Sequence, residues 1–263
     1  MKSRTPKVLH AICGRPMLAY VIDTAHAATG ASPLVVYSPQ TSEICEVFAG
    51  RADFALQEEP RGTGDAVRAA LDALGTDADE LVVMSGDVPL IDVETVLSLA
   101  ELRRESHAPV AVGSMVVGDP TGYGRILQRD GVIRGIVEEK DASDDERETQ
   151  LVNGGVYVFE TAWLRDRIAQ IKPSATTGEL YLTSLVALAA DEGRPAVTWT
   201  EEDAADEWTL GGINDRVGLE EARFFMQAAI IERLQLAGVT VEGASSIIDA
   251  SVEIGRASCR ERV

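Results

Sequence analysis

Residues 81–90 have the sequence Leu81-Val82-Val83-Met84-Ser85-Gly86-Asp87-Val88-Pro89-Leu90, and this stretch decides the fold. The apolar run predicts a buried strand, and the turn after it puts Asp87 at the carboxyl end of that strand. Ligands bind at this end of the strands in an open α/β sheet, where a carboxylate can hold a divalent metal that bridges phosphates. By itself the stretch fits a plain strand and turn with a solvated Asp87 equally well.

Strand and helix patterns alternate through the first half of the chain. Short apolar runs predict strands over residues 33–38, 53–56 and 81–84. Helical spacing and capping residues predict helices over residues 16–28, 42–48, 62–74 and 93–105. This alternation is typical of a parallel sheet with helices on both faces.

The second half of the chain predicts a mixed sheet. Asp130-Gly131, between residues 124–128 and 132–138, is a strong hairpin signal. Further strands are expected over residues 108–117, 154–159 and 196–200, and helices over residues 161–171, 178–191 and 216–236. We expect this half to build a substrate wall on the parallel core.

Composition excludes several classes of function. The 263 residues carry a formal net charge of -19, which argues against a nucleic-acid surface. Three cysteines and three histidines are scattered, with no CxxC pair, so neither a zinc site nor a disulfide framework is expected. The sequence has no apolar run of about 18 residues, and no apolar stretch follows its basic N-terminal residues, so no signal peptide is expected there. These features predict a reduced, cytoplasmic protein without a membrane partner.

Several short motifs have residue types suited to phosphate and nucleotide chemistry. Gly62-Thr63-Gly64 lies between a strand and a helix, where small residues and free amides admit a polar ligand. Gln57 can bond a nucleobase edge, and Lys7 is a point charge suited to phosphate. Each also has an ordinary interpretation, as a tight turn, a surface glutamine or a solvated lysine.

A second set of residues is suited to holding a sugar. Gly122-Tyr123-Gly124-Arg125 precedes the hairpin, and glycines there suit a bend or a close ligand approach. Glu138 ends the hairpin and can accept hydrogen bonds from hydroxyls, and Asn153 can bond a sugar. An exposed charge run at residues 138–141 and a plain turn at Asn153 are the alternatives.

One known family has these motifs in the same order. They are Met1-Lys2-Ser3, Pro6-Lys7-Val8-Leu9-His10, Gln57 with Gly62-Thr63-Gly64, Gly86-Asp87-Val88-Pro89-Leu90, Pro120-Thr121-Gly122-Tyr123-Gly124-Arg125-Ile126, Ile136-Val137-Glu138-Glu139-Lys140-Asp141-Ala142, Asn153-Gly154-Gly155, Gly178-Glu179-Leu180-Tyr181-Leu182-Thr183 and Gly212-Ile213-Asn214. Over residues 1–254 the ordered set resembles the bacterial N-acetylglucosamine-1-phosphate uridylyltransferases, and more closely the N-terminal half of the bifunctional GlmU family.

The resemblance implies a role for each matching residue. The nucleotide-binding residues would be Lys7, Gln57, Gly62, Thr63, Ser85, Gly86 and Asp87. The sugar-binding residues would be Gly124, Glu138, Asn153, Tyr181 and Thr183. Asp87 and Asn214 would hold Mg²⁺, and Lys7 and Asp87 would be the catalytic residues.

The resemblance also implies the domain organisation. Residues 1–215 would form an α/β, Rossmann-like, GT-A-like nucleotidyltransferase domain with a mixed sheet that lacks its first strand. Residues 216–237 would be a connecting helix, and residues 238–254 the start of a left-handed β-helix. We interpret residues 255–263 as a non-native tail, because they match one reading frame of a common sequencing adapter.

The chain departs from the family pattern at both ends and at Ser184, where an Asp is common. The family's glycine-rich phosphate loop would lie before Met1, and most of the acetyltransferase β-helix would lie after residue 254. We therefore expect a gap, or a forced pairing, between the strands at 33–38 and 81–84. We also expect poor solubility and no activity from these residues alone. The full-length parent would be a homotrimer through its β-helix.

The activity implied by the resemblance is formation of UDP-N-acetylglucosamine and pyrophosphate from UTP and N-acetylglucosamine 1-phosphate. This reaction serves cell-wall precursor synthesis. The attacking phosphate is already ionised, so positioning and charge neutralisation would do most of the catalysis. Two alternatives stay open: a related nucleotidyltransferase for another sugar phosphate, and a non-catalytic module that binds nucleotide sugars.

Overall fold

The computed structural model describes residues 3, 5–75, 78–200, 209–242 and 246–253. Its strands are β1 (Ala11–Ile12), β2 (Arg15–Pro16), β3 (Leu34–Tyr37), β4 (Asp53–Leu56), β5 (Glu80–Met84), β6 (Val110–Val116), β7 (Arg125–Arg129), β8 (Val132–Val137), β9 (Leu151–Glu160) and β10 (Val197–Thr200). Its helices are α1 (Met17–Thr29), α2 (Glu43–Val47), α3 (Thr63–Ala73), α4 (Val93–Ser106), α5 (Asp144–Arg147), α6 (Thr161–Arg167), α7 (Ser184–Asp191) and α8 (Arg216–Leu236), with 3-10 turns η1 (Lys7–Leu9), η2 (Pro39–Thr41) and η3 (Ile168–Gln170).

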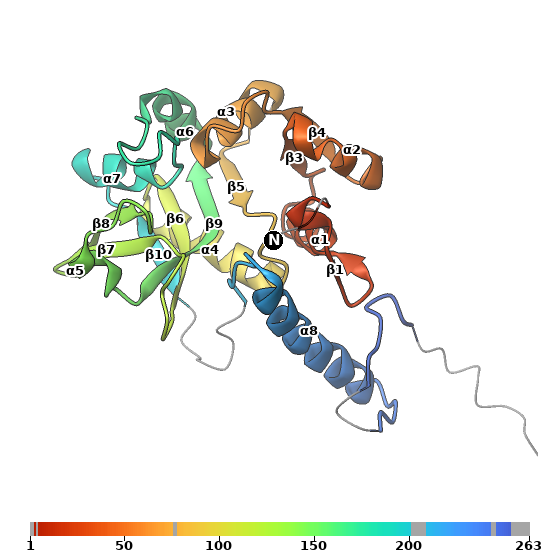
Figure 1. Ribbon diagram of the computed structural model, residues 1–263. Coiled ribbons are helices and arrows are strands. Elements are labelled where there is room, and N and C mark those ends of the chain that lie inside the picture. Colours follow the sequence, from red (N-terminus) through yellow and green to blue (C-terminus); the bar gives the residue numbers. More distant parts are fainter. Residues whose placement is uncertain (1–2, 4, 76–77, 201–208, 243–245, 254–263) are drawn as a thin grey trace, which may run out of the picture.

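A six-stranded mixed sheet forms the centre of the molecule, in the order β10-β6-β9-β7-β8, with β5 also paired to β9 (Figure 1). The ten-residue β9 runs antiparallel to β5, β6 and β7, and only β10 lies parallel to its neighbour β6. Strand β5 thus has an antiparallel partner from the second half of the chain, and the parallel pairing expected in the first half occurs between β3 and β4. Buried apolar residues of β9, from Val152 to Phe159, lie in the clusters on both faces of this sheet.

Strands β3 and β4 form a separate parallel sheet, and no ladder joins β3 to β5 in the described chain (Figure 1). The expected gap between these strands is present. Helix α1 spans it with the buried side chains of Leu18, Val21 and Ile22, against which Val35 of β3 and Met84 of β5 pack. Apolar contacts thus hold the two sheets together where backbone hydrogen bonds do not.

The β7–β8 hairpin confirms its sequence signal. Asp130 and Gly131 both have positive φ, of 54° and 74°, as a two-residue turn of this type requires. The helix predicted over residues 178–191 is wrong in its first half, because α7 begins only at Ser184. Leu180 instead gives its N–H to Arg61 and its carbonyl to Gly64, and this pairing keeps residues 178–183 out of the helix.

The sequence analysis missed the β1–β2 hairpin, whose turn has positive φ at Cys13 and Gly14. The helix predicted over residues 216–236 is present as α8, and the chain after it folds back along α8 toward this hairpin. Ala250 N–H donates to the Cys13 carbonyl over 2.8 Å, and the Gln227 side chain forms two hydrogen bonds with the backbone of Ile248.

The described parts of residues 238–253 contain neither strand nor helix, so the start of a β-helix stays a prediction. The expected non-native tail at residues 255–263 lies outside the described residues. In the part of the chain that the structure describes, no helix combines the length and apolar character needed to cross a membrane.

Candidate active site

Lys7, Asp87 and Asn214 come together although they are far apart in the sequence. The Lys7 ammonium forms an ion pair with Asp87 Oδ2, and Lys7 Nζ also donates to Asn214 Oδ1 over 3.0 Å. The ammonium lies between a carboxylate and an amide oxygen. Two of the residues assigned to the metal and one assigned to phosphate thus form a single polar cluster.

Backbone hydrogen bonds fix Asp87 at the carboxyl end of β5. Ser85 N–H donates to the Gly155 carbonyl over 2.9 Å, which ties the turn to β9. Ile213 N–H donates to the Asp87 carbonyl over 2.9 Å, and this bond sets Asn214 beside Asp87. The side chain of Asp87 keeps 22% of its surface exposed, so it remains accessible to a ligand.

The oxygens of Asp87 and Asn214 fit a hard divalent cation. The Lys7 ammonium already occupies a place between them, which shows that the geometry favours positive charge there. Among the residues described, no group of three or more His, Cys, Asp or Glu side chains is positioned to hold a metal ion. Two protein ligands with phosphate and water oxygens completing the shell are typical of Mg²⁺.

Gly124, Glu138, Asn153 and Thr183 form a second group. Asn153 N–H donates to the Gly124 carbonyl over 2.9 Å, and Thr183 Oγ1 donates to Glu138 Oε1 over 2.7 Å. A Cβ added at Gly124 would lie 3.4 Å from Glu138 Oε2 and 3.6 Å from Asn153 Cβ. These four predicted sugar residues are therefore neighbours. Gly124 keeps open the space between the other side chains.

Burial raises the pKa of Glu138, and the hydrogen bond from Thr183 acts in the opposite direction. Asn153 is held from both sides of its amide, because Nδ2 donates to the Tyr157 hydroxyl over 2.7 Å and Oδ1 accepts from Gly155 N–H over 3.1 Å. Burial also raises the pKa of Tyr157, so its hydroxyl stays protonated at neutral pH. Glu138 and Asn153 thus project from fixed positions.

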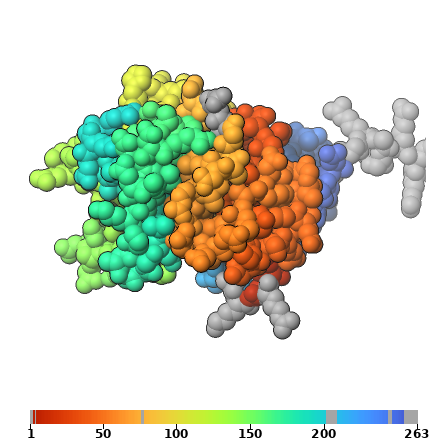
Figure 2. All heavy atoms as spheres, turned by 90° about the horizontal axis from the view of Figure 1, so that it is seen from above, coloured from red at the N-terminus to blue at the C-terminus, as the bar shows by residue number. Residues whose placement is uncertain are grey.

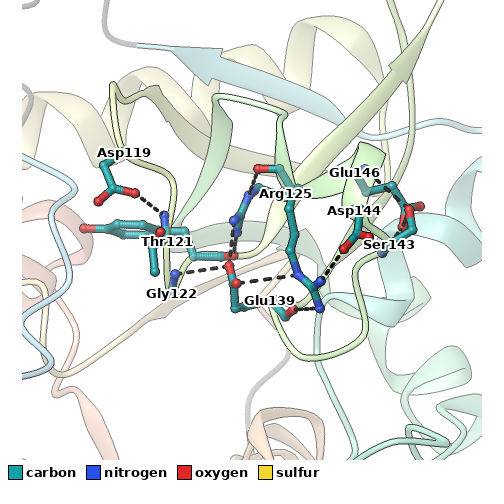
Figure 3. Close-up of polar contacts among 10 residues, drawn as sticks. Asp119, Thr121, Gly122, Arg125, Glu139, Ser143, Asp144 and Glu146 are labelled. Carbon is teal, nitrogen blue, oxygen red and sulfur yellow. Dashed lines mark hydrogen bonds and ion pairs between the residues drawn. The ribbon is translucent and has the colours of Figure 1, made fainter.

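Arg125, the residue after Gly124 of this second group, bonds the loops on either side of the β7–β8 hairpin, and Figure 3 shows its contact with Glu139. Its residue is only 1% exposed, and Arg125 Nη2 donates to Glu139 Oε2 over 2.6 Å. The same Glu139 oxygen accepts from Gly122 N–H over 3.2 Å, and the guanidinium also donates to the Tyr123 carbonyl. The hydrogen bond from Arg125 lowers the pKa of Glu139. This buried ion pair connects the loop before β7 to the loop after β8.

The predicted nucleotide residues Gly62 and Thr63 lie at the start of α3, and Gln57, directly after β4, donates to the Gly62 carbonyl over 3.2 Å. Gly62 has φ of 115°, and a Cβ there would come within 2.5 Å of the Leu180 carbonyl oxygen. A Cβ at Gly64 would meet the same oxygen at 3.0 Å. Packing therefore explains the two glycines of this motif, because a side chain at either position would collide with the backbone of Leu180. This explanation holds whether or not a ligand also approaches them.

Residues 180–183 connect the nucleotide group to the sugar group. Leu182 N–H donates to Thr63 Oγ1 over 2.9 Å, and the next residue, Thr183, bonds Glu138. Figure 2 shows the green segment that carries α6 packed against the orange segment that carries α3. Tyr181 is bonded to Thr177 over 2.8 Å, and burial raises the pKa of its hydroxyl.

The structure adds residues that sequence reasoning did not single out. Asp65, Arg125 and Glu139 bond predicted site residues or the loops that carry them. Asp65 follows a helix start and Glu139 lies in a charge run, so both resemble ordinary surface charges in the sequence. A cavity of about 490 Å³ between α1 and α8 contains none of the predicted site residues.

Comparison with known proteins agrees with this geometry. A family model described as "Nucleotidyl transferase" matches residues 2–214. The bifunctional protein GlmU of Mycobacterium avium (strain 104) is 41% identical, with 97% of this chain and 54% of that protein covered. The bifunctional protein GlmU of Sorangium cellulosum (strain So ce56) is also 41% identical, with 96% and 54% covered. The chain spans about half the length of these curated relatives.

A solved structure supports the fold. The putative glucose-1-phosphate thymidylyltransferase from Bacillus anthracis superposes with a TM-score of 0.64. The match covers 84% of this chain and 88% of that chain, at 19% identity. At that identity the likeness concerns the architecture of the mixed α/β sheet.

Proposed function

The chain belongs to the nucleotidyl transferase family, and from this premise we propose that it takes part in uridylyl transfer from UTP to N-acetylglucosamine 1-phosphate. The products are UDP-N-acetylglucosamine and pyrophosphate. The observation that carries the proposal is the convergence of Lys7, Asp87 and Asn214 at the end of β5. The identity of about 41% to GlmU proteins supports the choice of substrates.

In this proposal the first cluster binds the phosphates. The Lys7 ammonium turns from Asp87 toward the phosphate oxygens, where its charge offsets theirs. Asp87 and Asn214 hold Mg²⁺, which supplies charge neutralisation and orients the phosphate oxygens when it is bound. Ser85 and Gly86 form the turn beside the nucleotide, and Gln57, Gly62 and Thr63 hold the uracil.

The second group binds the sugar. Glu138 accepts hydrogen bonds from sugar hydroxyls or the acetamido group, and Asn153 orients the ring from the opposite strand. Thr183 steadies Glu138, and Tyr181 lies next to it in the chain. Gly124 leaves room for the sugar between these side chains.

The chemical step requires little proton transfer. An oxygen of the sugar phosphate attacks the α-phosphorus of UTP, the bond from that phosphorus to the bridging oxygen breaks, and pyrophosphate leaves with the electron pair. Because the attacking phosphate is already ionised, the protein contributes mainly position and compensating charge. Lys7 is suited to the second task because an ammonium group is a compact positive charge that bonds phosphate oxygens.

The wider role follows from the family resemblance. We place the reaction in the cytoplasm, in cell-wall peptidoglycan precursor synthesis, as part of a multifunctional protein whose second half carries acetyltransfer. A homotrimer formed through that second half is part of the same proposal. The relatives' printed name, "Bifunctional protein GlmU", supports the two-activity arrangement.

Equilibrium binding tests the proposal on this chain directly. UDP-N-acetylglucosamine with Mg²⁺ should bind at least about tenfold more tightly than UDP-glucose, since Glu138 and Asn153 contact the amino-sugar end. Equal affinity for the two nucleotide sugars contradicts the amino-sugar assignment and favours a related nucleotidyltransferase. Absence of binding of any uridine nucleotide to the folded, soluble chain contradicts the proposed function altogether.

A pyrophosphate-release assay separates an enzyme from a binding module. UTP and N-acetylglucosamine 1-phosphate are supplied with Mg²⁺, and glucose 1-phosphate replaces the amino sugar in the control. Release that depends on N-acetylglucosamine 1-phosphate supports catalysis by this chain. Tight binding of UDP-N-acetylglucosamine without release favours the non-catalytic module.

A further inference from the structure

The side-chain amide of Gln57 has both of its N–H donors engaged. Gln57 Nε2 donates to Asp65 Oδ2 over 2.9 Å and to the Gly62 carbonyl oxygen over 3.2 Å. A primary amide nitrogen has two hydrogens, so these two bonds use its donor capacity fully. The acceptor Oε1 is the polar atom of this side chain that the two bonds leave unused.

Chemistry fixes the orientation of this amide. The two atoms facing Nε2 are a carboxylate oxygen and a peptide carbonyl oxygen, and both accept hydrogen bonds only. Rotating the amide by 180° would place Oε1 against two acceptors and lose both bonds. Asp65 and Gly62 therefore present Gln57 to its surroundings as an acceptor.

Asp65 is buried and is held by two arginines. Its residue is 5% exposed, although it lies in the first turn of α3, and it forms ion pairs with both Arg61 and Arg68. The two guanidiniums, which remain partly exposed, compensate the buried negative charge. The carboxylate oxygen directed at Gln57 is thereby held in place.

We propose that Asp65 is a positioning residue that sets base specificity by locking Gln57 as a hydrogen-bond acceptor. This inference rests on the proposed function, in which Gln57 contacts the base. An acceptor at this position matches the N3–H group of uracil. The N3 atom of cytosine has no hydrogen and is itself an acceptor, so it faces Gln57 Oε1 without a bond. Selectivity against cytosine thus originates in a residue that never contacts the nucleotide.

The test compares UTP, CTP and 3-methyl-UTP, in which a methyl group replaces the N3 hydrogen. Binding to the 263-residue chain with Mg²⁺ is measured by NMR titration. The unaltered chain should bind UTP at least about tenfold more tightly than either other nucleotide, because both leave a partly buried acceptor unpaired. Equal affinity for UTP and 3-methyl-UTP overturns the inference without any variant.

The variant Asp65→Asn then tests whether Asp65 fixes the orientation of the Gln57 amide. An amide at residue 65 can donate to Oε1 as well as accept from Nε2, so Gln57 can turn and offer a donor. The UTP-to-CTP preference should fall by about tenfold. Asp72→Asn is the matched control, because it removes the same charge from an exposed position on the same helix. It should keep the preference of the unaltered chain.

The outcomes separate this inference from the proposed function. If Asp65 had only a structural role, Asp65→Asn would weaken UTP and CTP binding by the same factor. An unchanged ratio of UTP to CTP affinity in this variant overturns the inference and leaves the proposed uridylyl transfer intact. If the unaltered chain binds no uridine nucleotide, the proposed function and this inference fall together. Gln57→Leu should abolish the preference, and a preference that survives it contradicts the role of Gln57.

Discussion

Ile213 donates its backbone N–H to the carbonyl of Asp87 over 2.9 Å, and this one bond joins the end of β5 to the segment that leads into α8. It places Asn214 beside the Asp87 carboxylate, with Lys7 Nζ bonded to both side chains. Two of the three distant segments that build the site are thus joined by a backbone contact that side-chain substitutions leave intact. Variants of Asp87 and Asn214 therefore test ligand binding rather than folding.

Asp87→Asn should remove most of the Mg²⁺ dependence of UTP binding. A neutral amide is a weaker ligand for a hard cation, and the pair with Lys7 is lost as well. We expect the gain in UTP affinity on adding Mg²⁺ to fall about tenfold or more, measured by calorimetric titration with and without the ion. Asp130→Asn, at the exposed hairpin tip, is the control and should leave this gain unchanged.

Glu138→Gln should weaken binding of UDP-N-acetylglucosamine about tenfold and leave UTP binding within twofold. The amide keeps an oxygen for the Thr183 hydroxyl but loses the negative charge that strengthens bonds from sugar hydroxyls. Titrations with both ligands give the two affinities. An equal loss of affinity for both would contradict the assignment of Glu138 to the sugar.

Glu138 and Glu139 should affect the pH dependence of stability in opposite directions. Burial raises the pKa of Glu138 in the folded chain above the value of about 4.3 expected in the unfolded chain. Ionisation of Glu138 therefore lowers the stability of the fold as the pH rises between these two pKa values. Glu138→Gln should therefore gain on the order of 1 kcal/mol of unfolding free energy relative to the unaltered chain at neutral pH.

For Glu139 the sign reverses, because the hydrogen bond from Arg125 lowers its pKa. The stability that Glu139 contributes to the fold is complete at pH values above its pKa in the unfolded chain. This contribution disappears as the pH falls through its lowered pKa in the folded chain. Glu139→Gln should destabilise the chain at pH 7 and approach the unaltered chain in acid. Urea unfolding of the two variants from pH 3 to pH 8 gives the unfolding free energy of each as a function of pH. Parallel pH profiles for the two variants would contradict the opposite effects assigned to Glu138 and Glu139.

Arg125→Met should destabilise the chain at the lower end of the ~3–5 kcal/mol typical of broken buried ion pairs. The guanidinium is almost fully buried, but Glu139 is 32% exposed and can regain water when its partner is removed. Urea unfolding measures the loss, and the double variant Arg125→Met with Glu139→Gln should recover part of it. A change below 0.5 kcal/mol, the scale of ordinary surface substitutions, would show that the pair does not hold these loops.

Gly62→Ala should cost at least about 1–3 kcal/mol, because its backbone conformation is one that residues with a Cβ rarely adopt. The added Cβ would also come within 2.5 Å of the Leu180 carbonyl oxygen and push residues 180–183 away from Thr63. Uridine nucleotide binding should weaken together with thermal stability. Gly118→Ala, which meets nothing within 4 Å and has no positive φ, should leave both unchanged.

Local chemistry made several elements predictable from the sequence. The β7–β8 hairpin follows from Asp130-Gly131, since few other residues adopt two successive positive φ angles. Strand β5 and the turn at Gly86-Asp87 follow from an apolar run with a glycine after it. The first half of the predicted 178–191 helix failed because Leu180 pairs with Arg61 and Gly64, residues that are remote in the sequence.

The sequence by itself determined the motif order that identifies the family, the residue types at the proposed site and the acidic balance, which argues against a nucleic-acid surface. Only the tertiary structure decided which strands pair, because β9 takes β5 as an antiparallel neighbour through contacts that no local pattern encodes. It also decided the positions of Asp65 and Glu139. A carboxylate in a helix start or a charge run is solvated unless the fold brings Gln57 or Arg125 to it, and that proximity exists only once distant segments have packed together.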